Sequence, residues 1–227
     1  MLSIDTAGVL AGAALAPSEI CYLFGTHFAG KGNAPAPAPH LPDHKDVDID
    51  KLVVDLLAVA LLASEQVGAL RLELRQGKAL FGLRKVNQVF VTATETSTPF
   101  FKGSWEAKLY TQAAKSKERT SELANLVFML VPESTSPFGE VIGLLLVGMN
   151  ARGLLDVLET TKLKVFHSKR FQLKESTSTL ATQQPLDAVK ALLNTSQQGR
   201  PELHKLLLEG IRRGVSRSEK SDDYGPD

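Results

Sequence analysis

Residues 40–50 carry the densest group of side chains in the chain that could bind a metal ion. These are His40, Asp43, His44, Asp46, Asp48 and Asp50. Acidic residues at every second position are typical of the start of a calcium-binding loop, but that loop needs Gly at its sixth position and Glu at its twelfth. Lys51 and Leu57 stand there instead. The sequence therefore predicts no metal site, and we expect Asp48 or Asp50 to cap a helix that begins at this point.

Motifs that bind nucleotides or activate a nucleophile are missing from the sequence. Gly30-Lys31-Gly32 lacks the spacing of a phosphate-binding loop, and no Gly-x-Ser-x-Gly turn occurs. Cys21 lies in an apolar segment, which is typical of a buried and unreactive thiol. The histidines that could act as bases are far apart in the sequence, and their convergence in space stays open; they are His27, His167 and His204. We predict a protein that is not an enzyme and has no cofactor.

Two groups of basic residues could bind an anion, one after residue 160 and one near the C-terminus. The anion-binding candidates are Lys162, Lys164, Lys169, Arg170, Lys174, Arg212 and Arg213. The chain has 26 basic and 25 acidic residues and a net charge of +1, so only a local patch could attract nucleic acid or anionic lipid. Three interpretations stay open: contacts to DNA phosphates, contacts to anionic phospholipid headgroups, or a solvated strand pair without a ligand.

The elements that would position these residues follow the same order twice. In the first unit, residues 50–64 have apolar side chains at helical spacing, and the helix closes at Gly68. Residues 69–83 then alternate as a hairpin around a turn at 76–78. A further strand is expected at 88–94, where β-branched and aromatic residues gather.

The second unit has a more apolar helix, at residues 140–152, which closes at Gly153. Strands are expected at 154–158 and 163–173, with a break at 159–161. A helix, a glycine and two strands form the unit of a winged-helix-like fold. The predicted fold class is therefore α+β and mainly α-helical, with two such helix–hairpin units packed into one compact body.

Composition divides the chain into four predicted regions. They are an N-terminal helical segment at 1–29, a Pro- and Ala-rich linker at 30–47, a helical body at 48–214 and a disordered tail at 215–227. Alternating Ala-Pro favours an extended backbone, and the tail has almost nothing to bury. Residues 1–16 are small and apolar and predict a short helix on the body; a signal peptide is the alternative, although a basic start is missing.

Cysteine usage and the apolar runs indicate where the protein resides. Cys21 is the single cysteine, so the chain has no internal disulfide and suits a reducing compartment. The longest apolar runs of the body, at 52–63 and 141–149, are too short to cross a bilayer. We expect a cytoplasmic location, either free or at a membrane surface.

Five segments, taken in chain order, resemble a known family. Residues 15–25 resemble its opening Leu-x-x-x-Glu-x-x-Leu-Leu helix, and residues 55–73 its central helix, which runs through a glycine into a strand. The strand–loop–helix at 91–113, Asn-Ala-Arg-Gly-Leu-Leu at 150–155 and the late helix at 201–211 follow in the same order. Together they resemble the Golgi phosphoprotein 3 family over residues 16–214.

The resemblance implies a mostly helical peripheral protein with a hairpin used in self-association. Well-known members bind phosphatidylinositol 4-phosphate on Golgi membranes and act as trafficking adaptors. The family's headgroup site uses an aromatic residue and several arginines, whose positions fall near Asp48, Leu57, Ile142 and Leu145 in this chain. None of these is aromatic or basic, so the resemblance does not carry the lipid site over.

The function that these features predict is that of a non-catalytic adaptor or assembly protein, associated peripherally with membranes. Its partners would be a protein or further copies of itself, and an anionic membrane surface. The self-association candidates are the apolar residues of the first hairpin, Leu70, Leu72, Leu74 and Phe81, which could pair with another strand. The alternative is a tandem winged-helix DNA-binding regulator. The near-neutral charge and the absence of Lys and Arg from residues 140–151 favour the adaptor.

Overall fold

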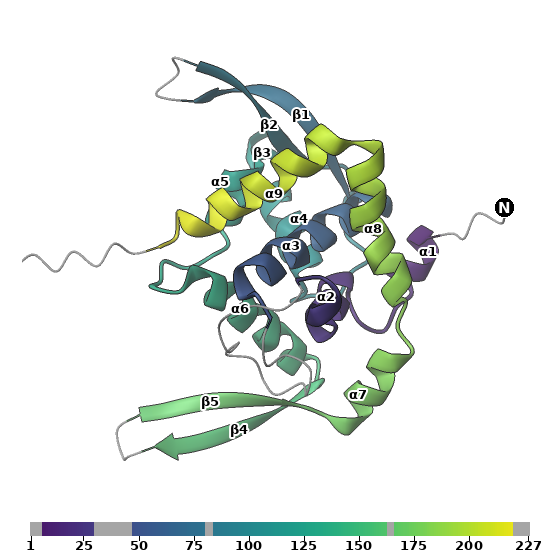
Figure 1. Cartoon of the computed structure of the whole chain (residues 1–227), viewed down its shortest axis with the longest axis vertical. Helices are drawn as coiled ribbons and strands as arrows, with labels where there is room; N and C mark the ends of the chain where they lie inside the picture. Colours follow the sequence, from purple (N-terminus) through teal and green to yellow (C-terminus); the bar gives the residue numbers. More distant parts are fainter. Residues whose placement is uncertain (1–5, 30–46, 80–83, 163–165, 220–227) are drawn as a thin grey trace, which may run out of the picture.

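The structure is a computed structural model that describes residues 6–29, 47–79, 84–162 and 166–219 (Figure 1). Its helices are α1 (Thr6–Ala11), α2 (Pro17–Leu23), α3 (Ile49–Gln66), α4 (Trp105–Lys115), α5 (Leu123–Phe128), α6 (Pro137–Ala151), α7 (Glu175–Thr182), α8 (Leu186–Gly199) and α9 (Pro201–Ser216), with short 3₁₀ turns η1 (Gly25–His27) and η2 (Lys117–Arg119). Its strands are β1 (Leu70–Ala79), β2 (Arg84–Ala93), β3 (Thr120–Glu122), β4 (Leu155–Lys162) and β5 (Phe166–Leu173). The predicted α+β, mainly α-helical class is confirmed.

Helix α3 runs through the middle of the body, with α2, α4, α6, α8 and α9 packed around it (Figure 1). Its residues from Leu52 to Ser64 are all buried. A helix that is apolar on every side can be satisfied only when other elements cover every side. The Asp48 carboxylate accepts a hydrogen bond of 3.0 Å from the Lys51 backbone N–H, so the predicted N-terminal cap is confirmed.

The two predicted glycine stops have the same geometry. Gly68 after α3 has φ 76° and Gly153 after α6 has φ 73°, a left-handed conformation that favours glycine. In each case the glycine N–H and the next N–H donate to carbonyls of the last helical turn. Ala69 N–H reaches the Ser64 carbonyl at 2.9 Å, and Leu154 N–H reaches the Met149 carbonyl at 3.1 Å. Both helices therefore end where the sequence predicts, and both lead into a hairpin.

The first sheet has the antiparallel order β1-β2-β3. The predicted turn at 76–78 is wrong, because Gly77 lies inside β1 opposite Val86. The missing Cβ of Gly77 leaves the space that the Gln88 side chain fills, so this glycine permits a close approach across the strands and does not form a turn. The strand expected separately at 88–94 is the second strand of this hairpin. Phe81 lies outside the described residues.

The second sheet is the antiparallel hairpin β4–β5. Its predicted break at 159–161 is wrong, since Thr160 pairs with Ser168 and Thr161 with His167 inside a continuous ladder. Threonine is a good strand former, and the cross-strand partners supply the context that a single segment lacks. The β1–β2 and β4–β5 hairpins project from opposite ends of the body (Figure 1).

Two of the predicted segments differ in the structure. The N-terminal segment is part of the body, because Leu15 and Ile20 are buried in the common core. The polar composition of residues 176–182 predicts a loop, but this segment forms helix α7. The predicted linker, apart from Val47, lies outside the described residues.

The predicted start of the tail at residue 215 is wrong. Helix α9 continues to Ser216, and Ser218 is buried, with its hydroxyl donating to the Val131 carbonyl at 3.1 Å. The Ser134 backbone N–H donates to the Ser218 carbonyl at 2.9 Å. Hydrogen bonds across the fold thus satisfy polar residues that composition alone assigns to a tail.

Candidate functional site

The two predicted groups of basic residues lie apart. The β4–β5 hairpin is at one end of the body, whereas α9 crosses the other (Figure 1). Lys162 lies in β4, and Lys169 and Arg170 lie in β5, but the structure does not describe their side chains. Lys164 lies outside the described residues. Lys174 is described, and its ammonium lies 3.8 Å from the Asp156 carboxylate. Its charge is therefore offset by a neighbouring acid.

The C-terminal half of α9 presents the second group. Arg212, Arg213 and Arg217 are exposed there, near the negative end of the helix dipole. Arg213 Nη2 lies 2.6 Å from Glu122 Oε1, and Arg217 Nη1 donates to Asn125 Oδ1 at 2.6 Å. These contacts tie α9 to β3 and α5, so Arg213 and Arg217 have a structural role as well as an exposed charge.

Arg212 opens onto a different part of the surface. It lines a hollow of about 390 Å³ beside the start of α6. The hydroxyls of Thr135 and Ser136 and the carboxylates of Asp50 and Glu219 share this hollow. The two acids offset the guanidinium, so the hollow does not concentrate positive charge.

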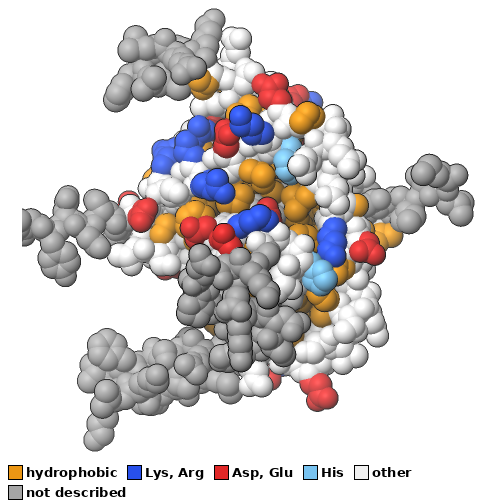
Figure 2. Space-filling view, viewed as in Figure 1, with side chains coloured by type: hydrophobic (Ala, Val, Ile, Leu, Met, Phe, Trp, Pro, Cys, Tyr) orange, Lys and Arg blue, Asp and Glu red, His pale blue; other side chains and the backbone are white. Residues whose placement is uncertain are grey.

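A second hollow lies between η1, α3, α8 and α9, and the sequence did not predict it. It has a volume of about 380 Å³. Its lining residues are His27, Phe28, Lys51, Asp55, Lys190, Leu193, Asn194, Gln197, His204 and Leu208. Lys and Arg side chains and histidines gather over α8 and α9 around an apolar strip (Figure 2). We refer to this hollow as the α8–α9 pocket.

The α8–α9 pocket brings His27 and His204 together, as the sequence left open. Lys190 Nζ lies 3.2 Å from His27 Nδ1. An ammonium group can only donate, so this contact assigns Nδ1 as the acceptor and places the ring proton on Nε2. His204 Nδ1, from α9, lies 3.3 Å from the hydroxyl of Ser196 in α8.

Among the described residues of the pocket lining, Asp55 alone carries a carboxylate, and it is already paired. Lys51 Nζ lies 2.9 Å from Asp55 Oδ2 and 2.6 Å from the Phe28 carbonyl oxygen. Burial raises the pKa of Asp55 despite this partner, because desolvation outweighs the attraction of Lys51. Burial also lowers the pKa of His204, and Asp55 partly offsets that shift. Lysines 51 and 190 against one carboxylate leave the lining with net positive charge.

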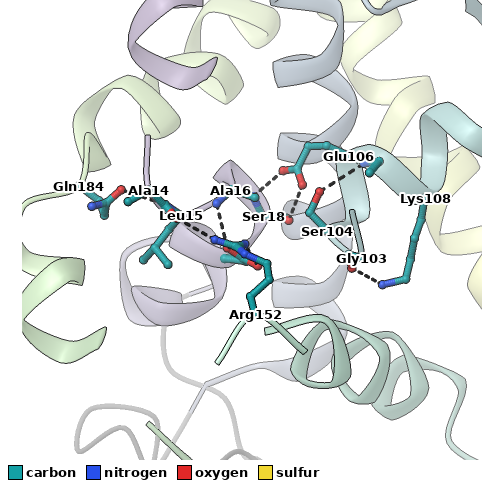
Figure 3. A network of polar contacts seen from close by, with 12 residues as sticks. Ala14, Leu15, Ala16, Ser18, Gly103, Ser104, Glu106, Lys108, Arg152 and Gln184 are labelled. Carbon is teal, nitrogen blue, oxygen red and sulfur yellow. Dashed lines mark hydrogen bonds and ion pairs between the residues drawn. The ribbon is translucent and has the colours of Figure 1, made fainter. Parts of the chain in front are cut away.

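A buried polar network lies away from this pocket, where α2, α4 and the end of α6 meet (Figure 3). Glu19 and Glu106 are 1% and 0% exposed. Arg152 Nη1 lies 2.6 Å from each Glu19 carboxylate oxygen, and Glu106 accepts hydrogen bonds from Ser18 N–H at 2.7 Å and Ser18 Oγ at 2.8 Å. Burial raises the pKa of both Glu19 and Glu106 as the largest effect.

This network joins α2 to α4 and to the end of α6. The second nitrogen of the Arg152 guanidinium donates to the Ala14 carbonyl at 2.7 Å, and the guanidinium lies 3.8 Å from the centre of the Phe101 ring. Lys108 donates to the carbonyls of Gly103 and Leu144. These polar groups thus form hydrogen bonds with neighbouring elements, which is typical of a network that stabilises the fold.

The self-association candidates on β1 face the protein's own core. Leu70 and Leu72 are 2% and 4% exposed, and Leu74 packs against the same core. The side chains of Leu70 and Leu72 therefore offer no apolar face to another copy, while pairing of the strand with another chain stays a prediction. The alternation was identified correctly, but its apolar face is covered by the helices that the sequence could not place.

The outer edge of β1 is also partly closed. The backbone N–H of Leu72 donates to Glu65 Oε1 at 3.1 Å, and the Arg200 guanidinium pairs with the same carboxylate. Arg71 and Arg75 both pair with Glu73 on the exposed side of the strand. Charged side chains and capped donors protect a strand edge from pairing with other chains.

Only one feature of the α8–α9 pocket could have been predicted from the sequence. Asp55 is a single acid among apolar residues of α3, and Lys51 stands one turn before it, so this pair could have been predicted. Lys190 and His27 are 163 residues apart and gave no such indication.

Comparison with known proteins adds no relative: no protein-family model, curated protein or solved structure matches this chain.

Proposed function

We propose that the protein is a non-catalytic adaptor that associates with an anionic membrane surface through the C-terminal half of α9. The observation that carries the proposal is that three arginines are exposed at the C-terminal end of α9: Arg212 and Arg213 in its last turns and Arg217 at its C-cap. Basic side chains that face anionic lipid contribute about 1 kcal/mol each. None of the described helices has the length and apolar character to span a bilayer, so such an association would be peripheral.

An adaptor also needs a surface for a protein partner or a second copy. We place it on the β4–β5 hairpin, which projects from the body and carries the exposed Val157 (Figure 1). The described part of this two-stranded sheet has no neighbour on either outer edge. The resemblance to the Golgi phosphoprotein 3 family, with its self-associating hairpin, agrees with this placement. Light scattering over a range of protein concentrations would detect self-association as an increase in mass.

The alternative, a tandem winged-helix DNA-binding regulator, gains no support from the helix that would enter the groove. Val141, Ile142 and Leu145 of α6 are buried, and α6 contains no Lys or Arg. A recognition helix needs an exposed polar or basic face to reach base edges and phosphates. We therefore propose the adaptor alone.

Vesicle flotation tests the membrane part of the proposal. The protein should float with vesicles of phosphatidylcholine and phosphatidylserine and remain at the bottom with phosphatidylcholine alone. Arg212→Glu changes the local charge by two units, which corresponds to about 2 kcal/mol or roughly a 30-fold weaker association.

The matched control is Lys102→Glu, which makes the same charge change at an exposed position outside α9. It should float like the unmodified protein. Equal flotation of both variants, or no dependence on phosphatidylserine, would remove the proposal. Added salt should weaken the association, because exposed charges are screened.

A further inference from the structure

We infer that the α8–α9 pocket is a binding site for a small organic oxyanion, a carboxylate or phosphate monoester with a short apolar body. This site is separate from the arginines of α9 proposed to meet a membrane. Its volume of about 380 Å³ is within the range of small-molecule sites. At about 30 Å³ per water molecule, it suits a ligand of modest size.

The donors for an anionic head come from η1 and α8. Lys190 directs one ammonium proton toward His27 Nδ1 at 3.2 Å. An ammonium group has three protons, so Lys190 can donate to an oxyanion while it holds the imidazole. Nε2–H of His27 and the side-chain amides of Asn194 and Gln197 add neutral donors in the same lining. Several donors around one cation suit an oxyanion with two or three acceptor oxygens.

The charge balance of the pocket selects the sign of the ligand. The Asp55 carboxylate is engaged by Lys51 at 2.9 Å, so its charge is offset within the protein. No other acid among the described lining residues is left to pair with Lys190. A ligand anion would therefore meet net positive charge, whereas a cation would be repelled.

The pocket also has apolar lining residues. Phe28, Leu193 and Leu208 line it, and all three are partly buried hydrophobic residues that pack against the core. A short alkyl body placed here would leave water, which is favourable in proportion to the buried apolar area. An anionic head with such a body matches both the donors and the apolar side chains of the lining.

Calorimetry with three probes tests this inference: n-butyl phosphate, sodium hexanoate and 1-hexanol. The two anions should bind and compete with each other, because they share one head site. The neutral alcohol should bind at least about tenfold more weakly, since it cannot replace a charge-assisted hydrogen bond.

Lys190→Gln removes the charge of the head site and should weaken both anions by about tenfold. The matched control is Lys205→Gln, at an exposed lysine of α9 outside the pocket lining, which should leave binding unchanged. Thermal unfolding of both variants checks that the fold is intact. A shift of the His27 ring resonances on addition of butyl phosphate would support the site independently of affinity.

Three results would overturn the inference: equal affinity for hexanol and hexanoate, no binding of either anion at millimolar concentration, or unchanged binding in Lys190→Gln. Flotation distinguishes the source of the head group. Normal flotation of Lys190→Gln supports a soluble ligand, whereas impaired flotation together with lost anion binding supports the head of a lipid in the same site. Anion binding by a protein that does not float would remove the membrane proposal and keep this one.

Discussion

Replacing Arg152 by Met should be the most damaging single change to the buried polar network. The guanidinium reaches both oxygens of Glu19 at 2.6 Å and the Ala14 carbonyl at 2.7 Å, and it covers the Phe101 ring. The side chains of Arg152 and Glu19 are 16% and 1% exposed, so water screens this ion pair little. Met fills much of the same volume but supplies neither charge nor donors.

The expected loss follows from leaving Glu19 buried without its partner. Removing one member of a buried ion pair costs about 3–5 kcal/mol. The lost contact with the Phe101 ring adds about 0.5–1 kcal/mol, because that ring is partly exposed. Since a domain has a total stability of only about 5–15 kcal/mol, the variant should unfold at much lower denaturant concentration.

The stability lost in Arg152→Met should depend on pH in a predictable direction. Burial already raises the pKa of Glu19 even with Arg152 present, and the loss of Arg152 would raise it further. A carboxyl group with a raised pKa in the folded state favours folding when it is protonated. The destabilisation of Arg152→Met should therefore be largest near neutral pH and shrink as the pH falls toward the usual carboxyl pKa of 4.5.

Urea unfolding followed by tryptophan fluorescence measures this loss directly. Trp105 is the only tryptophan and is fully buried, so its emission reports global unfolding. The control is Arg200→Met, whose ion pair with Glu65 is far more exposed and should cost no more than about 1 kcal/mol. The double variant Glu19→Met with Arg152→Met should recover most of the loss, because no unpaired charge remains. Equal stabilities of Arg152→Met and Arg200→Met would refute the reasoning.

Three further changes test other positions. Burial raises the pKa of Glu106, so the stability of the unmodified protein relative to Glu106→Gln should fall as the pH rises above 4.5, and a pH-independent difference in urea midpoints would contradict this. Gly214→Ala would place its Cβ 2.7 Å from the Ala124 carbonyl oxygen and should cost about 1–3 kcal/mol by overpacking the contact between α9 and α5. Gly143→Ala in α6 meets no atom within 4 Å and should stabilise the protein by about 0.5–1 kcal/mol, and thermal unfolding of the two variants compares them.

The parts of the fold that the sequence predicted correctly depend on local interactions. Asp48 caps α3 through a residue three positions away, and Gly68 and Gly153 end their helices through contacts within one turn. The strand boundaries were predicted less well, because they depend on the partner strand. Gly77 and Thr160 both resemble breaks when read alone, yet both lie in continuous ladders.

The candidate sites were harder to predict from the sequence than the helices. Arg212 and Arg213 were identified by charge, but the pairing of Arg213 with Glu122 could not be foreseen, since 91 residues separate them. Leu70 and Leu72 were identified as one apolar face, but periodicity does not say whether a face meets the protein's own helices or another molecule. The α8–α9 pocket was missed because its ionisable residues come from several separate elements.

By itself, the sequence determined the two main helices, α3 and α6, where they end, and that the fold is mainly α-helical with two hairpins. These features depend on side-chain periodicity and on hydrogen bonds between residues one turn apart. Only the tertiary structure decided which charges meet and which are buried. Arg152 and Glu19 are 133 residues apart, and Lys190 and His27 are 163 apart. Contacts at such separations form only when the helices pack around α3, and no local pattern in the chain specifies them.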